Sequence, residues 1–324
     1  MVRKVKILTV CLLTLGFFVT MLTVSATFAA DTFKVAIVLP GSINDESNNQ
    51  AGYEGLKVIE KELGAEVAYS EKVAQPDQEV YLLDYARRGY DLVIGHGGEF
   101  DDATAKAAKK FPNVKFFVTN GAAKGPNIAH GTVNIPHYAY ICGIVAAKMT
   151  KTNKIALVSG NEIPPVLPLI KVLKKALADY NPKAELGVIY TGSWDDVAKA
   201  KEATYAQVAK GVDVIFPALD LATLGVIEAA REKNVYTFGF VKDLLDVAPN
   251  NVLCSAIMNY SAVLLHVAKL VKEGKFVGGT AYYLGLETPG VTGTGRFSKV
   301  VPQEVKAEVS KAIQDIVAGK IQFD

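Results

Sequence analysis

The stretch that decides the fold covers residues 33–70. It starts with the apolar run FKVAIVLP (33–40), continues through the amphipathic segment NQAGYEGLKVIEKELG (49–64) and ends with AEVAYS (65–70). A short continuous apolar run is typical of a strand that is buried on both faces, and a 3.6-residue apolar period indicates a helix. A strand, a helix and a second strand in succession predict a parallel sheet covered by helices.

The same alternation continues along the chain and starts again after about residue 134. Further strand-like runs, separated by helix-period segments, are YDLVIGHG (90–97), VKFFVTN (114–120), NKIALVSG (153–160), KAELGVIY (183–190), VDVIFPA (212–218) and VYTFGF (235–240). Two arrays in tandem predict an α/β protein of two similar lobes, each a parallel sheet flanked by helices, with a hinged cleft between them. We expect residues 31–133 plus 255–280 in the first lobe and residues 134–254 plus 281–324 in the second.

The beginning of the chain has the pattern of a secretory signal peptide. The basic start MVRKVK precedes an apolar run over residues 7–24 and the small-residue stretch SATFAAD. We expect residues 1–30 to be removed by cleavage near Ala29 or Ala30, which leaves a soluble protein that is periplasmic or otherwise exported. Lipid anchoring at Cys11 is not expected, because a bulky valine precedes it. A retained membrane anchor is the alternative.

Charge and cysteine content narrow the classes of partner. The chain has 35 basic and 33 acidic residues, and the leader contains three of the basic ones and none of the acidic. The mature chain is therefore nearly neutral, so we expect neither nucleic acid nor an anionic membrane surface as partner. Cys142 and Cys254 lie in apolar segments, which favours two buried thiols over a disulfide.

The sequence contains none of the short motifs that carry catalysis or hold a cofactor. A G-x-G-x-x-G turn, a phosphate-binding P-loop, an H-E-x-x-H metal pair and a G-x-S-x-G nucleophile turn are all missing. We therefore expect no cofactor, no metal ion and no enzymatic activity.

The candidate ligand-binding residues follow the predicted strands, because ligands of open α/β sheets bind beyond the carboxyl ends of the strands. They are polar or small, with one tryptophan and few cations, which suits a neutral ligand with several donors and acceptors. The candidates are Asn44, Asp45, Asn49, His96, Gly97, Phe100, Asn120, Trp194, Asp220 and Asp243.

Four of these residues suggest specific roles, each with an alternative. Trp194 offers a flat face on which a ring can stack, or it fills the junction between a helix and its lobe. Asp45 is available for a ligand if Ser47 caps the following helix; otherwise Asp45 is the cap. Asn120 matches the paired hydrogen bonds that an amide forms with adenine, or it is a turn residue. His96 lies between glycines and is expected to line the pocket rather than to bind a metal.

Five stretches in order resemble the basic membrane protein family, which contains substrate-binding proteins of ABC importers whose best-known members bind purine nucleosides. The stretches are GSINDESNNQAGYEG (41–55), YDLVIGHGGEFDDATAKAAKKFPNVKFF (90–117), ICGIVAAKMTKTNKIALV (141–158), YTGSWDDVAKAKEA (190–203) and GVDVIFPALDLATLGVIEAAREKNVYTFGF (211–240). The resemblance covers essentially the whole mature chain. It implies a fold of the periplasmic-binding-protein type I kind with the ligand enclosed between two lobes. It also implies ligand contacts at Asn44, Asp45, the loop after Ile94, Asn120, Trp194 and the loop that ends in Asp243.

The sequence departs from the nucleoside receptors at informative positions. It has Asn48 where they usually have an aromatic residue and Asn120 where they have an aspartate. It has Val241 and Met258 where they have an aspartate and a lysine that are associated with the ribose. The stretch NEIPPVLPLI (161–170) and the GSWDD loop resemble a subgroup that takes free adenine.

The resemblance and its departures lead to one expected function. We expect an exported solute-binding protein, monomeric, that captures a purine base such as adenine, or second a nucleoside, and delivers it to an ABC permease in the membrane. A periplasmic nucleoside-processing enzyme and the ligand-sensing subunit of a signalling receptor are the alternatives.

Overall fold

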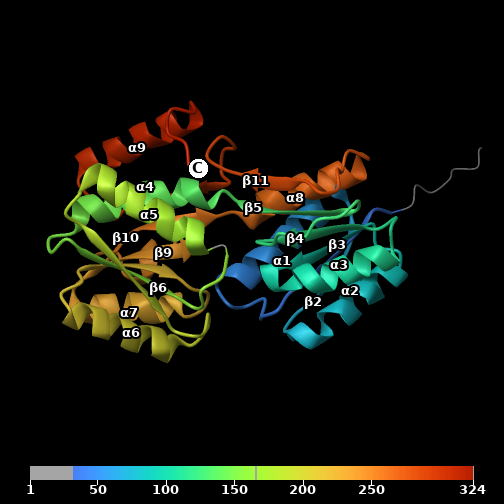
Figure 1. The fold of residues 1–324 in the computed structure, drawn as a ribbon, viewed down its shortest axis with the longest axis horizontal. Coiled ribbons are helices and arrows are strands. Elements are labelled where there is room, and N and C mark those ends of the chain that lie inside the picture. Colours follow the sequence, from blue (N-terminus) through green and yellow to red (C-terminus); the bar gives the residue numbers. More distant parts are fainter. Residues whose placement is uncertain (1–31, 165, 324) are drawn as a thin grey trace, which may run out of the picture. The chain divides into compact units, whose positions relative to one another are not determined.

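The computed structural model describes residues 32–164 and 166–323, and within them the chain forms two parallel-type sheets flanked by helices (Figure 1). The first sheet has the strand order β11-β5-β4-β3-β1-β2, and the second has the order β12-β10-β9-β8-β6-β7. All neighbouring strands in these sheets are parallel except β10 and β12. The predicted fold class is therefore confirmed.

The strands and helices alternate as the sequence pattern predicts. The strands are β1 (Lys34–Val38), β2 (Glu66–Ser70), β3 (Leu92–His96), β4 (Lys115–Thr119), β5 (Ile128–Val133), β6 (Lys154–Ser159), β7 (Glu185–Tyr190), β8 (Val214–Ala218), β9 (Tyr236–Val241), β10 (Val252–Met258), β11 (Ala281–Leu284) and β12 (Thr292–Gly293). The α-helices are α1 (Asn48–Leu63), α2 (Gln78–Arg87), α3 (Asp101–Lys110), α4 (Ile135–Met149), α5 (Val166–Tyr180), α6 (Val197–Ala209), α7 (Thr223–Lys233), α8 (Tyr260–Lys272) and α9 (Gln303–Val317). Short 3₁₀ turns lie at Gln75–Asp77, Gly98–Phe100 and Leu245–Val247.

Strand β1 shows why the central strands β1, β3 and β4 of the first sheet read as nearly continuous apolar runs. Val35 and Ile37 belong to the same buried cluster as Leu56 of α1, whereas Ala36 and Val38 belong to the cluster that contains Leu82 of α2. Successive side chains of a strand point to opposite faces, so both faces of the sheet are covered by helices.

The second sheet is covered in the same way. Helices α4 and α5 lie along one of its faces, and α6 and α7 lie along the other (Figure 1). Nearly every residue of α4 is buried because α5 and α9 also pack against this helix. Cys142 of α4 and Cys254 of β10 are free, fully buried thiols, as the sequence predicts.

The chain passes between the lobes after β5, after β10 and after β11. The predicted limits, 31–133 plus 255–280 and 134–254 plus 281–324, differ from the strand pairing at two places. Strand β10 stays in the second sheet through Met258, and β11 pairs with β5 in the first sheet. We therefore propose residues 32–133 with 260–284 as the first lobe and residues 135–258 with 286–323 as the second.

Strand β5 was not among the predicted strands, because its sequence IAHGTV contains a glycine and two polar residues. Gly131 is required by the neighbouring strand: a Cβ at this position would overlap the carbonyl group of Tyr282 in β11. A glycine inside a strand often marks such a close approach of another backbone.

The predicted leader, with its cleavage site near Ala29 or Ala30 and the possible lipid site Cys11, lies outside the described residues. In the described part of the chain, none of the helices combines the length and the apolar character that crossing a membrane requires.

Candidate functional site

The loop between β1 and α1 is organised by Asp45. Its carboxylate, 5% exposed, accepts hydrogen bonds from the backbone N–H groups of Ser47, Asn49 and Gln50 at 2.9–3.0 Å and from the Asn49 side chain at 2.7 Å. The Asn49 amide oxygen accepts from the backbone N–H of Gly41. Ser47 occupies the formal cap position, but its side chain makes no capping bond. The premise that Ser47 caps the helix and frees Asp45 for a ligand is therefore wrong.

Replacing Asp45 with alanine is expected to lower the free energy of unfolding by roughly 1–3 kcal/mol, because buried amide donors of α1 lose their acceptor. Urea unfolding followed by circular dichroism measures this. The control is Asn44→Ala: the Asn44 side chain is exposed, so its removal should change stability little. An Asp45→Ala protein with unchanged stability would contradict the capping role.

The Ser47 hydroxyl makes no capping bond and instead contacts the other lobe. Its Oγ donates a hydrogen bond to Oδ1 of Asp220, which follows β8, at 3.2 Å. Loss of hydration, followed by the negative charges of Asp45 and Asp195, raises the pKa of the Asp220 carboxyl to about 8. Asp220 therefore retains its proton at neutral pH, where it can donate as well as accept a hydrogen bond.

His96, at the end of β3, is fully buried and both ring nitrogens have partners. Nε2 lies 2.8 Å from the Asn48 carbonyl oxygen, and Nδ1 lies 2.9 Å from Oγ1 of Thr119. Because a carbonyl only accepts, Nε2 carries the proton and Nδ1 accepts from the threonine hydroxyl. Burial lowers the pKa of His96 to about 4, so the ring is neutral and positions α1 and β4.

The two residues predicted to accompany His96 differ in their surroundings. Gly97 is buried and has a φ of 133°, directly before the 3₁₀ turn. Phe100 is fully buried in the apolar cluster under α2 and α3, where its ring packs against Gly95. Phe100 is therefore packed in the core, and its predicted ligand contact stays a prediction.

Asn120 follows β4 in the left-handed backbone region, with a φ of 56°. Its Oδ1 accepts from Oγ1 of Thr132 at 2.6 Å, and its Nδ2 donates to the Tyr260 hydroxyl at 2.8 Å. The Tyr260 ring also makes an edge contact with His96, with 5.1 Å between the ring centres. The structure thus brings Asn120 and His96 together around Tyr260, a residue that the sequence prediction missed.

Trp194 lies in the loop after β7 and is partly buried. Its indole covers Gly160, so closely that a Cβ at Gly160 would overlap the ring. The Trp194 carbonyl accepts hydrogen bonds from the backbone N–H groups of Asp220 and Ala222 at 3.0 and 3.2 Å. The loops after β6, β7 and β8 are therefore joined, and Trp194 and Asp220 lie together at the carboxyl ends of these strands.

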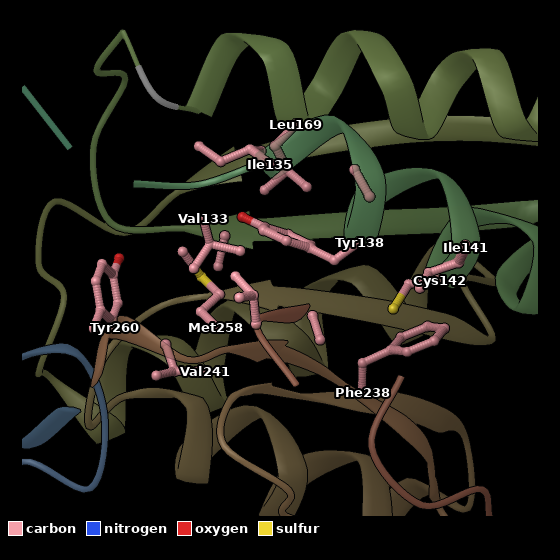
Figure 2. Close-up of a cluster of buried hydrophobic side chains, with 14 of the residues drawn as sticks. Val133, Ile135, Tyr138, Ile141, Cys142, Leu169, Phe238, Val241, Met258 and Tyr260 are labelled. Carbon is pink, nitrogen blue, oxygen red and sulfur yellow. The ribbon is translucent and has the colours of Figure 1, made fainter. Parts of the chain in front are cut away.

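A cavity of about 250 Å³ lies between α1 and the ends of β9 and β10. Residues from both lobes line it: Ala51, Glu54, Tyr260 and Ser261 from the first, Val241, Lys242, Asp243, Ile257 and Met258 from the second, and Asn259 from the crossing between them. Val241, Met258 and Tyr260 also belong to one buried cluster (Figure 2). The resemblance had singled out Val241 and Met258 only as departures from the nucleoside receptors.

Asp243 lines this cavity but is bound to another side chain. Its Oδ2 accepts from Nε of Arg296 at 2.7 Å, and its Oδ1 accepts from the backbone N–H of Leu245. Burial alone would raise the pKa of Asp243, but the Arg296 guanidinium and these hydrogen bonds lower it. Asp243 is thus a charged carboxylate that holds the segment after β9.

The comparisons with known proteins identify the family. The family of "ABC transporter substrate-binding protein PnrA-like" proteins, Bmp, matches residues 32–323. The chain belongs to the Bmp family. This family consists of substrate-binding proteins of ABC transporters.

Several Bmp-like proteins resemble the chain over most of its length. It is 30% identical over 283 residues to the transcriptional activator protein Med of Bacillus subtilis, covering 87% of each chain. It is 30% identical over 312 residues to the ABC transporter nucleoside-binding protein BmpA of Lactococcus lactis, covering 89% of this chain and 88% of BmpA. It is 27% identical over 252 residues to a purine-binding protein of Brucella abortus, covering 77% and 71%.

Solved structures agree with this family and its fold. A transcriptional activator of the comK gene from Bacillus halodurans is 28% identical, with a TM-score of 0.77, and the match covers 90% of this chain and 99% of that one. The glucose-galactose binding protein GanP from Geobacillus stearothermophilus matches in fold alone, with a TM-score of 0.62 at 19% identity over 79% of this chain and 96% of that one. The predicted periplasmic-binding-protein type I fold is thereby confirmed.

Proposed function

We propose that this chain is an exported solute-binding protein of an ABC importer that captures a purine-type ligand between its lobes and delivers it to a membrane permease. Membership of the Bmp family supports the transport role. The names of the nucleoside-binding relative from L. lactis and of the purine-binding relative from B. abortus support the ligand class. Trp194 would stack on the ring, and Asp220 and Asn120 would bind its polar edge.

The observation that carries the choice of ligand is the apolar wall that Val241 and Met258 give to the cavity between the lobes. The resemblance associates these positions with a charged pair that binds ribose hydroxyl groups. Hydroxyl groups placed against valine and methionine lose hydration and gain no hydrogen bond, which costs binding free energy. A free base such as adenine therefore suits this wall better than a nucleoside.

Calorimetric titration with adenine and adenosine tests this preference. We expect adenine to bind at least tenfold more tightly than adenosine. In the double variant Val241→Asp/Met258→Lys, the charged pair is restored and the preference is expected to move toward adenosine. Equal or tighter binding of adenosine by the unmodified protein would overturn the preference for a base, and binding of no purine would overturn the purine class.

Two other roles are separated by simple measurements. For an enzyme, incubation with nucleosides would yield free base that chromatography detects, whereas we expect unchanged nucleoside. The sensing role is favoured by the name of the B. subtilis relative, a transcriptional activator. Uptake of radiolabelled adenine by cells with and without the gene distinguishes it: transport requires a loss of uptake in the deletion strain.

A further inference from the structure

Lys242, at the carboxyl end of β9, reaches from the second lobe to the first. Its Nζ lies 3.5 Å from Oε2 of Glu46 and 3.5 Å from Oε1 of Glu54, which lie in the loop before α1 and on α1 itself. The Lys242 side chain is only 23% exposed, and the two glutamates are 59% and 51% exposed. One lysine thus faces two carboxylates across the lobe boundary.

The backbone before Lys242 is strained. Val241 has a φ of 67°, and the N–H of Lys242 donates to the carbonyl of Phe240 at 2.8 Å. A hydrogen bond over two residues with positive φ at the central residue defines the rare, strained form of the γ-turn. A β-branched residue in this region is a genuine outlier, and such residues cluster at functional sites.

The surroundings hold this γ-turn in place from both sides. Before it, Phe240 and Val241 pair with Ala256 and Ile257 of β10. After it, Asp243 is fixed by the Arg296 guanidinium at 2.7 Å. The turn reverses the chain sharply at the end of the strand, so that Lys242 lies opposite α1. Several independent contacts therefore maintain the strained backbone at Val241, and backbone strain that is maintained in this way is typical of functional sites.

We propose that Lys242 is a positioning residue for lobe closure: the γ-turn at Val241 holds its ammonium group against Glu46 and Glu54, and these ion pairs keep the lobes closed around the ligand. Lys242 and Glu54 also line the interlobe cavity, so the ion pairs form at the edge of the space that closing would seal. This proposal rests on the proposed function only where it is tested by ligand dissociation; the scattering test below needs no ligand.

The ion pairs exist only while the lobes are closed, so their loss should mainly accelerate the release of an enclosed ligand. We expect Lys242→Gln to accelerate ligand dissociation three- to tenfold in stopped-flow measurements, with the association rate little changed. The glutamates are half exposed, so salt screens the pairs. Dissociation from the unmodified protein should therefore accelerate between 50 and 500 mM NaCl, and dissociation from Lys242→Gln should not.

The chain offers a closely matched control in Lys201. Its side chain is 26% exposed and its Nζ lies 3.0 Å from Glu228 and 2.9 Å from Glu232, but all three residues belong to the second lobe. Lys201→Gln removes an equivalent pair of contacts without touching the lobe boundary. We expect it to leave the dissociation rate and its salt dependence unchanged, even if it lowers Tm.

A double-mutant cycle connects the effect to its partner. Glu54→Gln should accelerate dissociation less than Lys242→Gln, and the double variant should behave like Lys242→Gln alone. The charge-reversed pair Lys242→Glu/Glu54→Lys, combined with Glu46→Gln to remove the carboxylate that would repel the new one, should recover part of the slow dissociation. Unaltered dissociation in Lys242→Gln, or the same acceleration in Lys201→Gln, would overturn the proposal.

Small-angle scattering of the mature protein without ligand keeps this test independent of ligand identity. We expect a larger radius of gyration for Lys242→Gln than for the unmodified protein and Lys201→Gln. If no purine binds but this difference is found, the proposed function fails and the closing role of Lys242 stands. If purines bind and neither the radius nor the dissociation rate changes, the closing role fails and the proposed function stands.

Discussion

Replacing Trp194 with alanine is expected to weaken adenine binding by about five- to 150-fold in calorimetry. Stacking of a base on an aromatic side chain contributes about 1–3 kcal/mol, and each 1.4 kcal/mol corresponds to a factor of ten in Kd. Trp194 is placed for this role because it is joined to Asp220 by a backbone hydrogen bond, beyond the carboxyl ends of β7 and β8.

The matched variant is Trp194→Phe, which keeps a flat ring and should retain most of the affinity. Because the indole also packs on Gly160, Tm of each variant has to be measured beside its Kd. A folded Trp194→Ala protein with unaltered Kd would remove Trp194 from the site and leave it the structural role of covering Gly160.

Replacing Asp220 with asparagine is expected to stabilise the protein at pH 8 and to have a much smaller effect at pH 5. The pKa of Asp220 is about 8 in the folded chain and near 3.8 in an exposed carboxyl. The unfolded chain therefore releases this proton above about pH 4, while the folded chain holds it until about pH 8. Stability from this group is complete below pH 4 and falls as pH rises to 8, by at most about 1.4 kcal/mol per pH unit.

The measurement is the difference in Tm between Asp220→Asn and the unmodified protein at pH 5, 6, 7 and 8. We expect this difference to grow by roughly 2–5 °C over the series. Asparagine keeps an acceptor for the Ser47 hydroxyl, so the interlobe hydrogen bond is not lost. Asp102→Asn, an exposed position on α3, serves as the control and should show no such trend. A constant difference in Tm would show that Asp220 is already ionised at pH 5.

The strands of the core could be predicted because their signal is local. Strand β1 is apolar at each position after Lys34, because α1 covers one face of the sheet and α2 covers the other. Strand β5 could not be recognised from its own residues. Its Gly131 is required because the carbonyl group of Tyr282 in β11, which comes much later in the chain, leaves no room for a Cβ. The pairing of β11 with β5 in the first sheet could not be predicted for the same reason.

The site was predicted less well because the role of each polar residue depends on its partners. Asp45 and Ser47 are both acceptable caps in sequence, and only the folded loop shows that Asp45 caps and Ser47 turns to Asp220. Burial keeps His96 neutral, and its contacts with Asn48 and Thr119, which come from different elements, decide which ring nitrogen carries the proton. Lys242 has no local signal at all, since its partners lie on the other lobe.

The pairing of β11 with β5 in the first sheet also affects how the chain folds during its synthesis. This strand covers the edge of β5, and α8 packs beside α1, yet both are translated after the second lobe's β10. A chain emerging from the ribosome cannot complete its first lobe until nearly all of the polypeptide is available, and the open edge of β5 is exposed to wrong pairing until then. A circular permutant that begins at the second lobe would shorten this interval, because only residues 286–323 would then separate the two segments of the first lobe in the order of synthesis.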